Sequence, residues 1–211
     1  MLEKLNLYIV NYYKIKMLKN IFETTNFIDN PTVDGGLRKK GLLKKDDSEN
    51  PLITVITVVL NNEKYLEESI KSLHQQSYKN YEHIIIDGGS SDRTMEIIQK
   101  YENQIDYWCS SKDQGIYDAF NKGMKLARGR YLGFLNSDDV YEKDAFNILL
   151  KYIKNFPEKD FFFGAVKKHW GVLYGYRPYK IHWSWGFYSS HSTGFFIKTD
   201  SDINLSIHSR N

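Results

Sequence analysis

The stretch LITVITVVLNN at residues 52–62 decides the fold, because its first nine residues are all apolar or β-branched. A run of this kind is typical of a strand that is buried on both faces of a sheet. Asn61 or Asn62 is then expected to cap a helix, whose inner face carries Leu66, Ile70 and Leu73. One strand followed by one helix is the first unit of the predicted fold.

The strand-and-helix pattern repeats along the chain. Further strands are expected at residues 81–87, 105–108 and 131–135, and helices at residues 95–101, 116–127 and 146–153. This alternation predicts a single α/β domain of Rossmann-like type, with a mostly parallel central sheet and right-handed crossovers. Beyond residue 160 the helices stop, and strands are expected at residues 161–166 and 172–177.

The composition is that of a soluble globular protein, with 41% apolar and 26% charged residues. A formal net charge of +3 is too small to indicate binding to nucleic acid. Cys109 is the one cysteine of the sequence, so no disulfide can form within the chain. The apolar run at residues 53–60 is far shorter than the roughly 20 residues of a membrane span. The first residues lack the pattern of a signal peptide, so a cytoplasmic location is expected.

Residues 1–50 are interpreted as an N-terminal extension and linker. A loose helical stripe lies in the first part, formed by Leu5, Tyr8, Ile9, Tyr12, Ile15 and Met17. We prefer a helix that packs on the domain or on a partner, and a helix on a membrane surface stays open. A helix on a membrane surface would make the protein peripheral at the inner face of the plasma membrane. Residues 30–50, with two adjacent glycines and mixed charges, are typical of a linker.

An acidic turn, Asn136-Ser137-Asp138-Asp139, follows directly on the expected strand at residues 131–135. Parallel α/β sheets bind ligands beyond the carboxyl ends of their strands, which places this turn at the predicted binding edge. Adjacent carboxylates repel each other unless a cation lies beside them, and their hard oxygen atoms suit Mg²⁺ or Mn²⁺. A helix cap explains the same residues, because Asp and Ser are favoured at helix starts. The local pattern leaves both interpretations open.

Two other segments place polar side chains at the same edge. Asp87 ends its strand in front of a turn of small residues, where a carboxylate can accept a hydrogen bond from a base or a ribose. A tight turn alone explains Asp87 equally well. A helix opens within residues 115–123 and carries Asp118, Asn121 and Lys122, which are ordinary exposed residues when they stand alone.

Taken together and in order, these segments resemble the family 2 glycosyltransferases. The matching motifs are residues 53–62 with the helix that follows, residues 82–94, residues 113–123 and residues 133–139. The resemblance extends over residues 51–166, just over half of the chain. It is greatest to the branch that builds bacterial capsule, colanic-acid-like or lipopolysaccharide chains.

The resemblance implies a GT-A fold that binds a nucleoside-diphosphate sugar and transfers the sugar with inversion, with Mn²⁺ or Mg²⁺ as cofactor. Thr57 and Asp87 would contact the nucleotide base, Asp138 the ribose and metal region, and Asp139 the metal itself. The other implied donor-binding residues are Asn61, Gly115, Asp118, Asn121 and Lys122. The implied acceptor is a saccharide or a lipid-linked sugar.

Inversion in one displacement needs a general base for the acceptor hydroxyl. The resemblance implies an acidic residue well downstream of the acidic turn, and we assign this base to Asp202. The segment that contains Asp202 is short, so a truncated chain or a missing base stays open. Residues 51–140 are expected to bind the donor and residues 141–211 the acceptor. The alternative functions are a catalytically impaired nucleotide-sugar-binding protein or partner subunit, and a non-catalytic Rossmann-like module.

Overall fold

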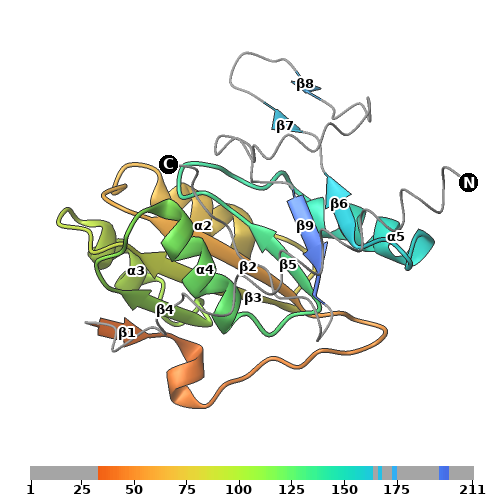
Figure 1. The fold of residues 1–211 in the computed structure, drawn as a ribbon, viewed down its shortest axis with the longest axis horizontal. Coiled ribbons are helices and arrows are strands. Elements are labelled where there is room, and N and C mark those ends of the chain that lie inside the picture. Colours follow the sequence, from red (N-terminus) through yellow and green to blue (C-terminus); the bar gives the residue numbers. More distant parts are fainter. Residues whose placement is uncertain (1–32, 164–165, 168–172, 175–194, 200–211) are drawn as a thin grey trace, which may run out of the picture.

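β2 (Ile53–Val59) lies in the middle of a seven-stranded sheet, and all seven of its residues are buried. The structure is a computed structural model, and it describes residues 33–163, 166–167, 173–174 and 195–199. The strand order is β1-β4-β3-β2-β5-β9-β6 (Figure 1). The other strands of this sheet are β1 (Val33–Gly35), β3 (Tyr81–Asp87), β4 (Tyr107–Ser110), β5 (Tyr131–Phe134), β6 (Phe161–Phe163) and β9 (Phe195–Lys198).

The four central strands run parallel. β3 pairs in parallel with β2 and β4, and β2 also pairs in parallel with β5. The outer strands are antiparallel, β1 to β4 and β9 to both β5 and β6. The expected α/β fold with a mixed, centrally parallel sheet is therefore confirmed. Because the four central strands share one direction, their carboxyl ends meet at one edge of the sheet.

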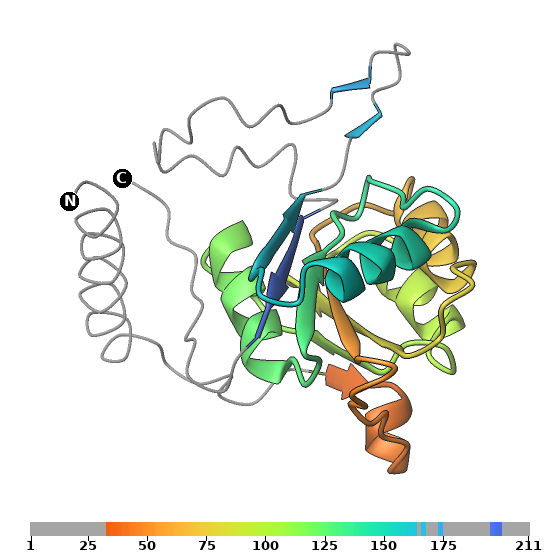
Figure 2. The ribbon, with the colours of Figure 1, turned by 90° about the vertical axis from the view of Figure 1, so that its right-hand side faces the viewer.

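Helices cover both faces of the sheet. One face holds α2 (Leu66–His74), α3 (Thr94–Lys100) and α5 (Ala145–Asn155). They pack in core clusters with Val55 and Val59. α4 (Ile116–Leu126) covers the other face, against Ile56 and Val58. Neighbouring residues of β2 thus face opposite layers, as the alternation along a strand requires. Figure 1 shows α4 in front of the sheet and α2 behind it, and Figure 2 shows α5 beside β6 and β9.

The beginning of the expected linker forms part of the sheet. β1 pairs with β4, so that Gly35 stands opposite Trp108. A Cβ atom on Gly35 would come within 2.6 Å of the Trp108 ring, which explains why glycine stands there. Gly36, with a φ of +102°, then turns the chain into a short 3-10 helix, η1 (Leu37–Lys40). The two glycines that are typical of a linker therefore serve close packing and a turn.

Several element boundaries also differ from the prediction. α2 begins at Leu66 and has no side-chain cap, so the expected cap by Asn61 or Asn62 is wrong. β4 lies slightly further along the chain than the expected strand at residues 105–108. After β6, a separate two-stranded sheet is formed by β7 (Val166–Lys167) and β8 (Leu173–Tyr174).

Across the residues that the structure describes, no helix is both long and apolar enough to span a membrane. α4 and α5 have 11 residues each, whereas a span needs about 20. The amphipathic stripe expected at residues 5–17 lies outside the described residues.

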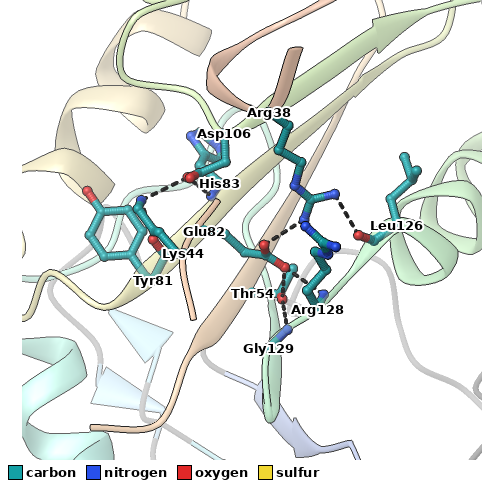
Figure 3. A network of polar contacts seen from close by, with 10 residues as sticks. All are labelled: Arg38, Lys44, Thr54, Tyr81, Glu82, His83, Asp106, Leu126, Arg128 and Gly129. Atoms are coloured by element: carbon teal, nitrogen blue, oxygen red, sulfur yellow. Dashed lines mark hydrogen bonds and ion pairs between the residues drawn. The ribbon is translucent and has the colours of Figure 1, made fainter. Parts of the chain in front are cut away.

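A buried carboxylate, that of Glu82, joins four segments at the amino end of the sheet (Figure 3). One of its oxygen atoms accepts hydrogen bonds from the Thr54 hydroxyl and the Arg128 backbone N–H. The other lies 2.6 Å from the Arg38 guanidinium, whose side chain is only 13% exposed. Arg38 also donates to the Leu126 carbonyl at 2.8 Å. The carboxylate therefore fixes η1, β2, β3 and the connection before β5 to one another.

A second ion pair anchors the segment that follows η1 (Figure 3). The Lys44 ammonium lies 2.9 Å from the Asp106 carboxylate and also donates to the Tyr81 carbonyl. Asp106 accepts a further hydrogen bond from the His83 backbone N–H at 2.8 Å. Burial raises the pKa of Asp106, and the charge of Lys44 opposes this rise. The segment after β1 thus closes the amino edge of the sheet with two inward-pointing cations.

Replacing Glu82 with Gln is expected to lower the free energy of unfolding by about 3 kcal/mol. The amide removes the counter-ion of the nearly buried Arg38. It also replaces one of the two carboxylate oxygens, which both accept hydrogen bonds, with an N–H donor. Urea denaturation followed by circular dichroism measures the change. Glu63→Gln is the control, because Glu63 pairs with Arg93 at an exposed position where a lost charge changes stability little. Equal losses in both variants would contradict the role of Glu82.

The protein is expected to lose stability between about pH 7 and about pH 5 because His83 is buried. Burial lowers the pKa of His83 well below its ordinary value. The unfolded chain takes up a proton at this residue near pH 6.5, while the folded protein does not, so the free energy of unfolding falls as the pH drops. Urea midpoints of the wild type and of His83→Gln at both pH values test this. The variant should lose less stability, and an equal loss would assign the effect to other groups.

Candidate functional site

The carboxyl ends of β2 and β5 lie next to each other at a topological switch point. The chain after β2 leads towards β3 on one side, and the chain after β5 leads towards β6 on the other. Ligands of α/β sheets bind where the connections of adjacent strands diverge in this way. β3 and β4 end at the same edge, because Val59 pairs with Asp87 and Asp87 pairs with Ser110. This edge is the candidate site.

The acidic turn begins inside the protein and ends at its surface. Asn136 and Ser137 are buried, Asp139 is half-buried and Asp138 is exposed. The Asp139 N–H donates to the Asn136 carbonyl at 3.1 Å, which closes the turn. The Asn136 side-chain amide also donates to a carboxylate oxygen of Asp139 at 3.0 Å. Two carboxylates therefore stand at the surface on a turn whose first half is fixed.

Helix α2 holds the chain on both sides of the acidic pair. The Ser69 hydroxyl donates to the Asn136 carbonyl at 3.2 Å. The Ser72 hydroxyl accepts a hydrogen bond from the Tyr141 backbone N–H at 3.0 Å. Ser69 and Ser72 lie three positions apart, so they share one face of the helix. The Tyr141 hydroxyl donates in turn to the Phe134 carbonyl at 3.0 Å. The turn is thus bonded to core elements before and after its carboxylates.

Asn62 connects the loop after β2 with the acidic turn. Its side-chain amide donates to the Ser137 hydroxyl at 2.8 Å. Its backbone N–H donates to the Thr94 hydroxyl at 2.9 Å. The hydrogen bond between Asn62 and Ser137 therefore crosses the switch point between the two loops.

Asp87 organises the turn that follows β3. Its buried carboxylate accepts hydrogen bonds from the Gly89 and Ser90 backbone N–H groups, each at 3.1 Å. It also accepts from the Ser90 hydroxyl and, at 2.6 Å, from the Ser110 hydroxyl. The tight turn that the sequence allows is present, and a contact between Asp87 and a nucleotide stays a prediction.

Asn61 belongs to the same turn and lies at the surface. Its backbone has a φ of +50°, a left-handed conformation that Asn adopts more readily than most residues. Its N–H donates to the Ser90 hydroxyl at 2.8 Å, and its side-chain oxygen accepts from the Ser91 N–H at 2.8 Å. The structure therefore brings Asn61 and Asp87 together, as expected for two residues at one edge.

The loop after β4 packs against this turn. A Cβ atom on Gly88 would come within 2.6 Å of the Asp113 carboxylate, so the two segments are in close contact. Asp113 accepts a hydrogen bond from the Gly115 N–H at 2.9 Å. Gly115, with a φ of +113°, precedes α4, and a Cβ atom there would meet nothing within 4 Å. The space beside Gly115 is thus open at the candidate edge.

The first turns of α4 carry a paired charge. The Lys122 ammonium lies 2.9 Å from the Asp118 carboxylate, and the Lys122 side chain is 15% exposed. Asp118 also accepts a hydrogen bond from the Gln114 N–H at 3.2 Å. Asn121 is half-buried on the same helix. These three expected donor residues lie on α4, which begins directly after Gly115.

Two expected site residues do not join this group. Thr57 is fully buried within β2, and its hydroxyl oxygen lies 2.9 Å from His83 Nε2. Its hydroxyl is therefore directed at a core side chain and not at the edge. Asp202, the expected base, lies outside the described residues.

The chemistry of the acidic turn fits a hard divalent cation. Asp138 and Asp139 offer carboxylate oxygen atoms, and Mg²⁺ is commonly bound by one or two carboxylates together with phosphate oxygens and water. Within the described ranges, no three His, Cys, Asp or Glu side chains gather into a site that could hold a metal ion.

A surface groove of about 640 Å³ lies next to the support of the turn, between α2 and residues 140–143. It includes Ser72 and Tyr141, and its charged walls are formed by Glu68, Lys71 and Lys143. Neither carboxylate of the acidic turn lines it. We therefore locate the candidate site by its chemistry at the strand ends and not by this groove.

Sequence reasoning missed the role of the residues that support the turn. Ser69 and Ser72 gave a weak signal, because they are hydroxyl residues three positions apart on the helix whose inner face is apolar. The contact of Asn62 with Ser137 left no local signal, because the two residues are 75 positions apart.

The site and fold can be compared with known proteins. The family model "Glycosyl transferase family 2" matches residues 54–207. The Bacillus subtilis protein named "Putative teichuronic acid biosynthesis glycosyltransferase TuaG" is 37% identical over 106 residues, which are 49% of this chain and 42% of that protein. An uncharacterized glycosyltransferase of Mycobacterium tuberculosis is 41% identical over 122 residues, which are 57% of this chain and 44% of that one. The matched part is thus less than half of either relative.

A solved structure agrees with the fold. The mannosyltransferase PcManGT from Pyrobaculum calidifontis, in complex with GDP-Man and Mn²⁺, superposes with a TM-score of 0.52 at 17% identity. The superposition covers 76% of this chain and 43% of that one, and at this identity it concerns the fold alone. Because the family model covers well over half of the sequence, and the fold agrees with it, the chain belongs to glycosyl transferase family 2.

Proposed function

We propose that this chain binds a nucleoside-diphosphate sugar and transfers its sugar, with inversion, to a saccharide or lipid-linked acceptor in the synthesis of a cell-surface polysaccharide. The observation that carries the proposal is the acidic turn at the switch point of a family 2 glycosyltransferase. The name of the Bacillus subtilis relative supports a polysaccharide product. GDP-Man and Mn²⁺ in the Pyrobaculum calidifontis fold neighbour support the donor class and the cofactor.

In the proposed complex, the nucleotide base lies at the turn after β3 and the diphosphate lies at the acidic turn. Asp87 and Asn61 shape the first of these turns. The open space beside Gly115 and the α4 residues Asp118, Asn121 and Lys122 complete the donor pocket. Lys122 would exchange its bond with Asp118 for a phosphate oxygen. Thr57 is left out of the contact set, because its hydroxyl is directed at His83.

Asp139 would hold Mn²⁺ or Mg²⁺, and Asp138 would lie at the ribose and metal region. The bound ion supplies positive charge for the departing diphosphate, which lowers the energy of the transition state. The chain's own contribution is to fix the ligand: the Asn136 amide holds the Asp139 carboxylate at 3.0 Å. A fixed carboxylate needs no rearrangement when the ion and the donor arrive.

The proposed transfer is a single displacement. The acceptor hydroxyl oxygen bonds to the anomeric carbon while the bond from that carbon to the diphosphate oxygen breaks, and the hydroxyl proton passes to a carboxylate. We assign the carboxylate to Asp202 and the acceptor side to residues 141–211. A lipid-linked acceptor would place the reaction on the cytoplasmic side of the plasma membrane, with the protein bound peripherally.

Metal-dependent stabilisation by a nucleoside diphosphate is expected. UDP or GDP with Mn²⁺, at about 100 times its Kd, should add about 2.7 kcal/mol and raise the Tm by roughly 5–10 °C. Asp139→Asn keeps the shape of the side chain but should lose the part of this shift that needs Mn²⁺. Asp47→Asn, at an exposed loop position, is the matched control. A wild type that Mn²⁺ and either nucleotide leave unchanged would refute the proposal.

Asp202→Asn is expected to separate binding from transfer. The amide cannot accept the hydroxyl proton, so transfer should fall by about 10²- to 10⁴-fold, while the shift caused by nucleotide and Mn²⁺ stays. Sugar transfer to a polysaccharide acceptor and the anomeric configuration of the product, followed by NMR, are the measurements. Asp200→Asn is the control. Unchanged transfer in Asp202→Asn would remove this residue as the base and leave donor binding intact.

A further inference from the structure

The backbone of Asn62 is held by a hydrogen bond to the start of α3. Its backbone N–H donates to the hydroxyl of Thr94, which is fully buried. Thr94 in turn donates its backbone N–H to the Asp92 carboxylate at 2.9 Å, and the same carboxylate accepts the Glu63 N–H at 3.0 Å. The backbone around Asn62 is therefore held by the start of α3, and its side chain has a fixed point from which to reach the acidic turn.

Ser137, the residue that Asn62 contacts, lies directly before the two carboxylates of the turn. Ser137 is 9% exposed, and it lies between buried Asn136 and exposed Asp138. The hydrogen bond from the Asn62 amide, at 2.8 Å, fixes the Ser137 hydroxyl at the point where the chain leaves the core. The turn is therefore held directly before its two carboxylates.

Asn62 differs from its neighbour Asn61 in what it holds. Asn61 is bonded to Ser90 and Ser91, and thus to the turn after β3. Asn62 is bonded across the switch point to the turn after β5. The two adjacent asparagines therefore support opposite sides of the candidate site, and only Asn61 is part of the proposed donor contacts.

We propose that Asn62 is a positioning residue for the metal-binding turn: through Ser137 it fixes the orientation in which Asp138 and Asp139 meet the cation and the donor diphosphate. This inference rests on the proposed function. Asn62 itself touches neither the ion nor the donor. Partners that orient metal ligands from the second layer typically contribute 10- to 100-fold to metal affinity. We expect the lower end of this range, because Asn136 and α2 also hold the turn.

The affinity for Mn²⁺ is the direct test. Asn62→Ala should weaken the binding of Mn²⁺ about tenfold in the presence of saturating UDP or GDP, measured by the loss of the free-ion EPR signal. Asn103→Ala removes an asparagine whose side chain accepts a hydrogen bond from Lys40 at an exposed position, and it should leave the affinity unchanged. Unchanged Mn²⁺ affinity in a folded Asn62→Ala protein would overturn the inference.

A double-mutant cycle tests whether the hydrogen bond is the cause. Ser137→Ala breaks the same bond from the other side, so it should weaken Mn²⁺ binding by a similar factor even if Asn62→Ala does not fold. Adding Asn62→Ala to Ser137→Ala should then change the affinity little. A further tenfold loss in the double variant would show that Asn62 acts by another route and would overturn the inference.

Failure of this inference is distinguishable from failure of the proposed function. A wild type without Mn²⁺-dependent nucleotide binding would refute the proposed function, and the inference with it. A wild type that binds, together with an Asn62→Ala variant that binds equally well, would refute the inference alone. Melting temperatures of all variants show whether a change in affinity accompanies a general loss of stability.

Discussion

The fold depends on the way the buried carboxylate of Glu82 is neutralised. A charge in the core is costly unless cations and N–H or O–H donors surround it. Here the donors come from β2, from the connection before β5 and from η1, so the carboxylate is satisfied only when all of them are in place. Thr54 also accepts the Gly129 N–H at 2.8 Å, which ties β2 to the start of β5 a second time. Neutralising one charge therefore aligns neighbouring parallel strands at their amino ends.

The alignment of the strands at their amino ends also sets the positions of their carboxyl ends, where donor and metal binding are proposed. Strands whose starts are fixed also end at fixed levels, so Asp87 stands beside Ser110 and the loop of Asn62 stands beside Ser137. Hydrogen bonds at this edge then orient individual side chains, as the Asn136 amide does for Asp139. The amino edge is held by ion pairs and the carboxyl edge by hydrogen bonds between loops. The proposed ligand chemistry thus lies at the edge that carries the surface carboxylates.

The sequence was sufficient for the elements that carry strong periodic signals. β2 consists of apolar and β-branched residues, β3 contains three consecutive isoleucines, and the alternation with helices indicated a parallel sheet and its binding edge. β1 escaped prediction because a strand of three residues that ends in the first of two glycines gives no such signal, and its pairing depends on Trp108. The direction of the Thr57 hydroxyl depends on His83 in the neighbouring strand. The bond between Asn62 and Ser137 depends on the strand order, which a local pattern does not contain.

The ion pair of Arg38 also has a consequence for the order of events during synthesis. Its guanidinium binds Glu82, 44 positions later, and the Leu126 carbonyl, 88 positions later. At about 5–20 residues per second, roughly 4–18 seconds pass between the synthesis of Arg38 and that of Leu126. Throughout that time the amino edge of the sheet cannot close, however early β2 and α2 form. The segment around Arg38 is thus made early, but it reaches all of its native contacts only after Leu126 has been made.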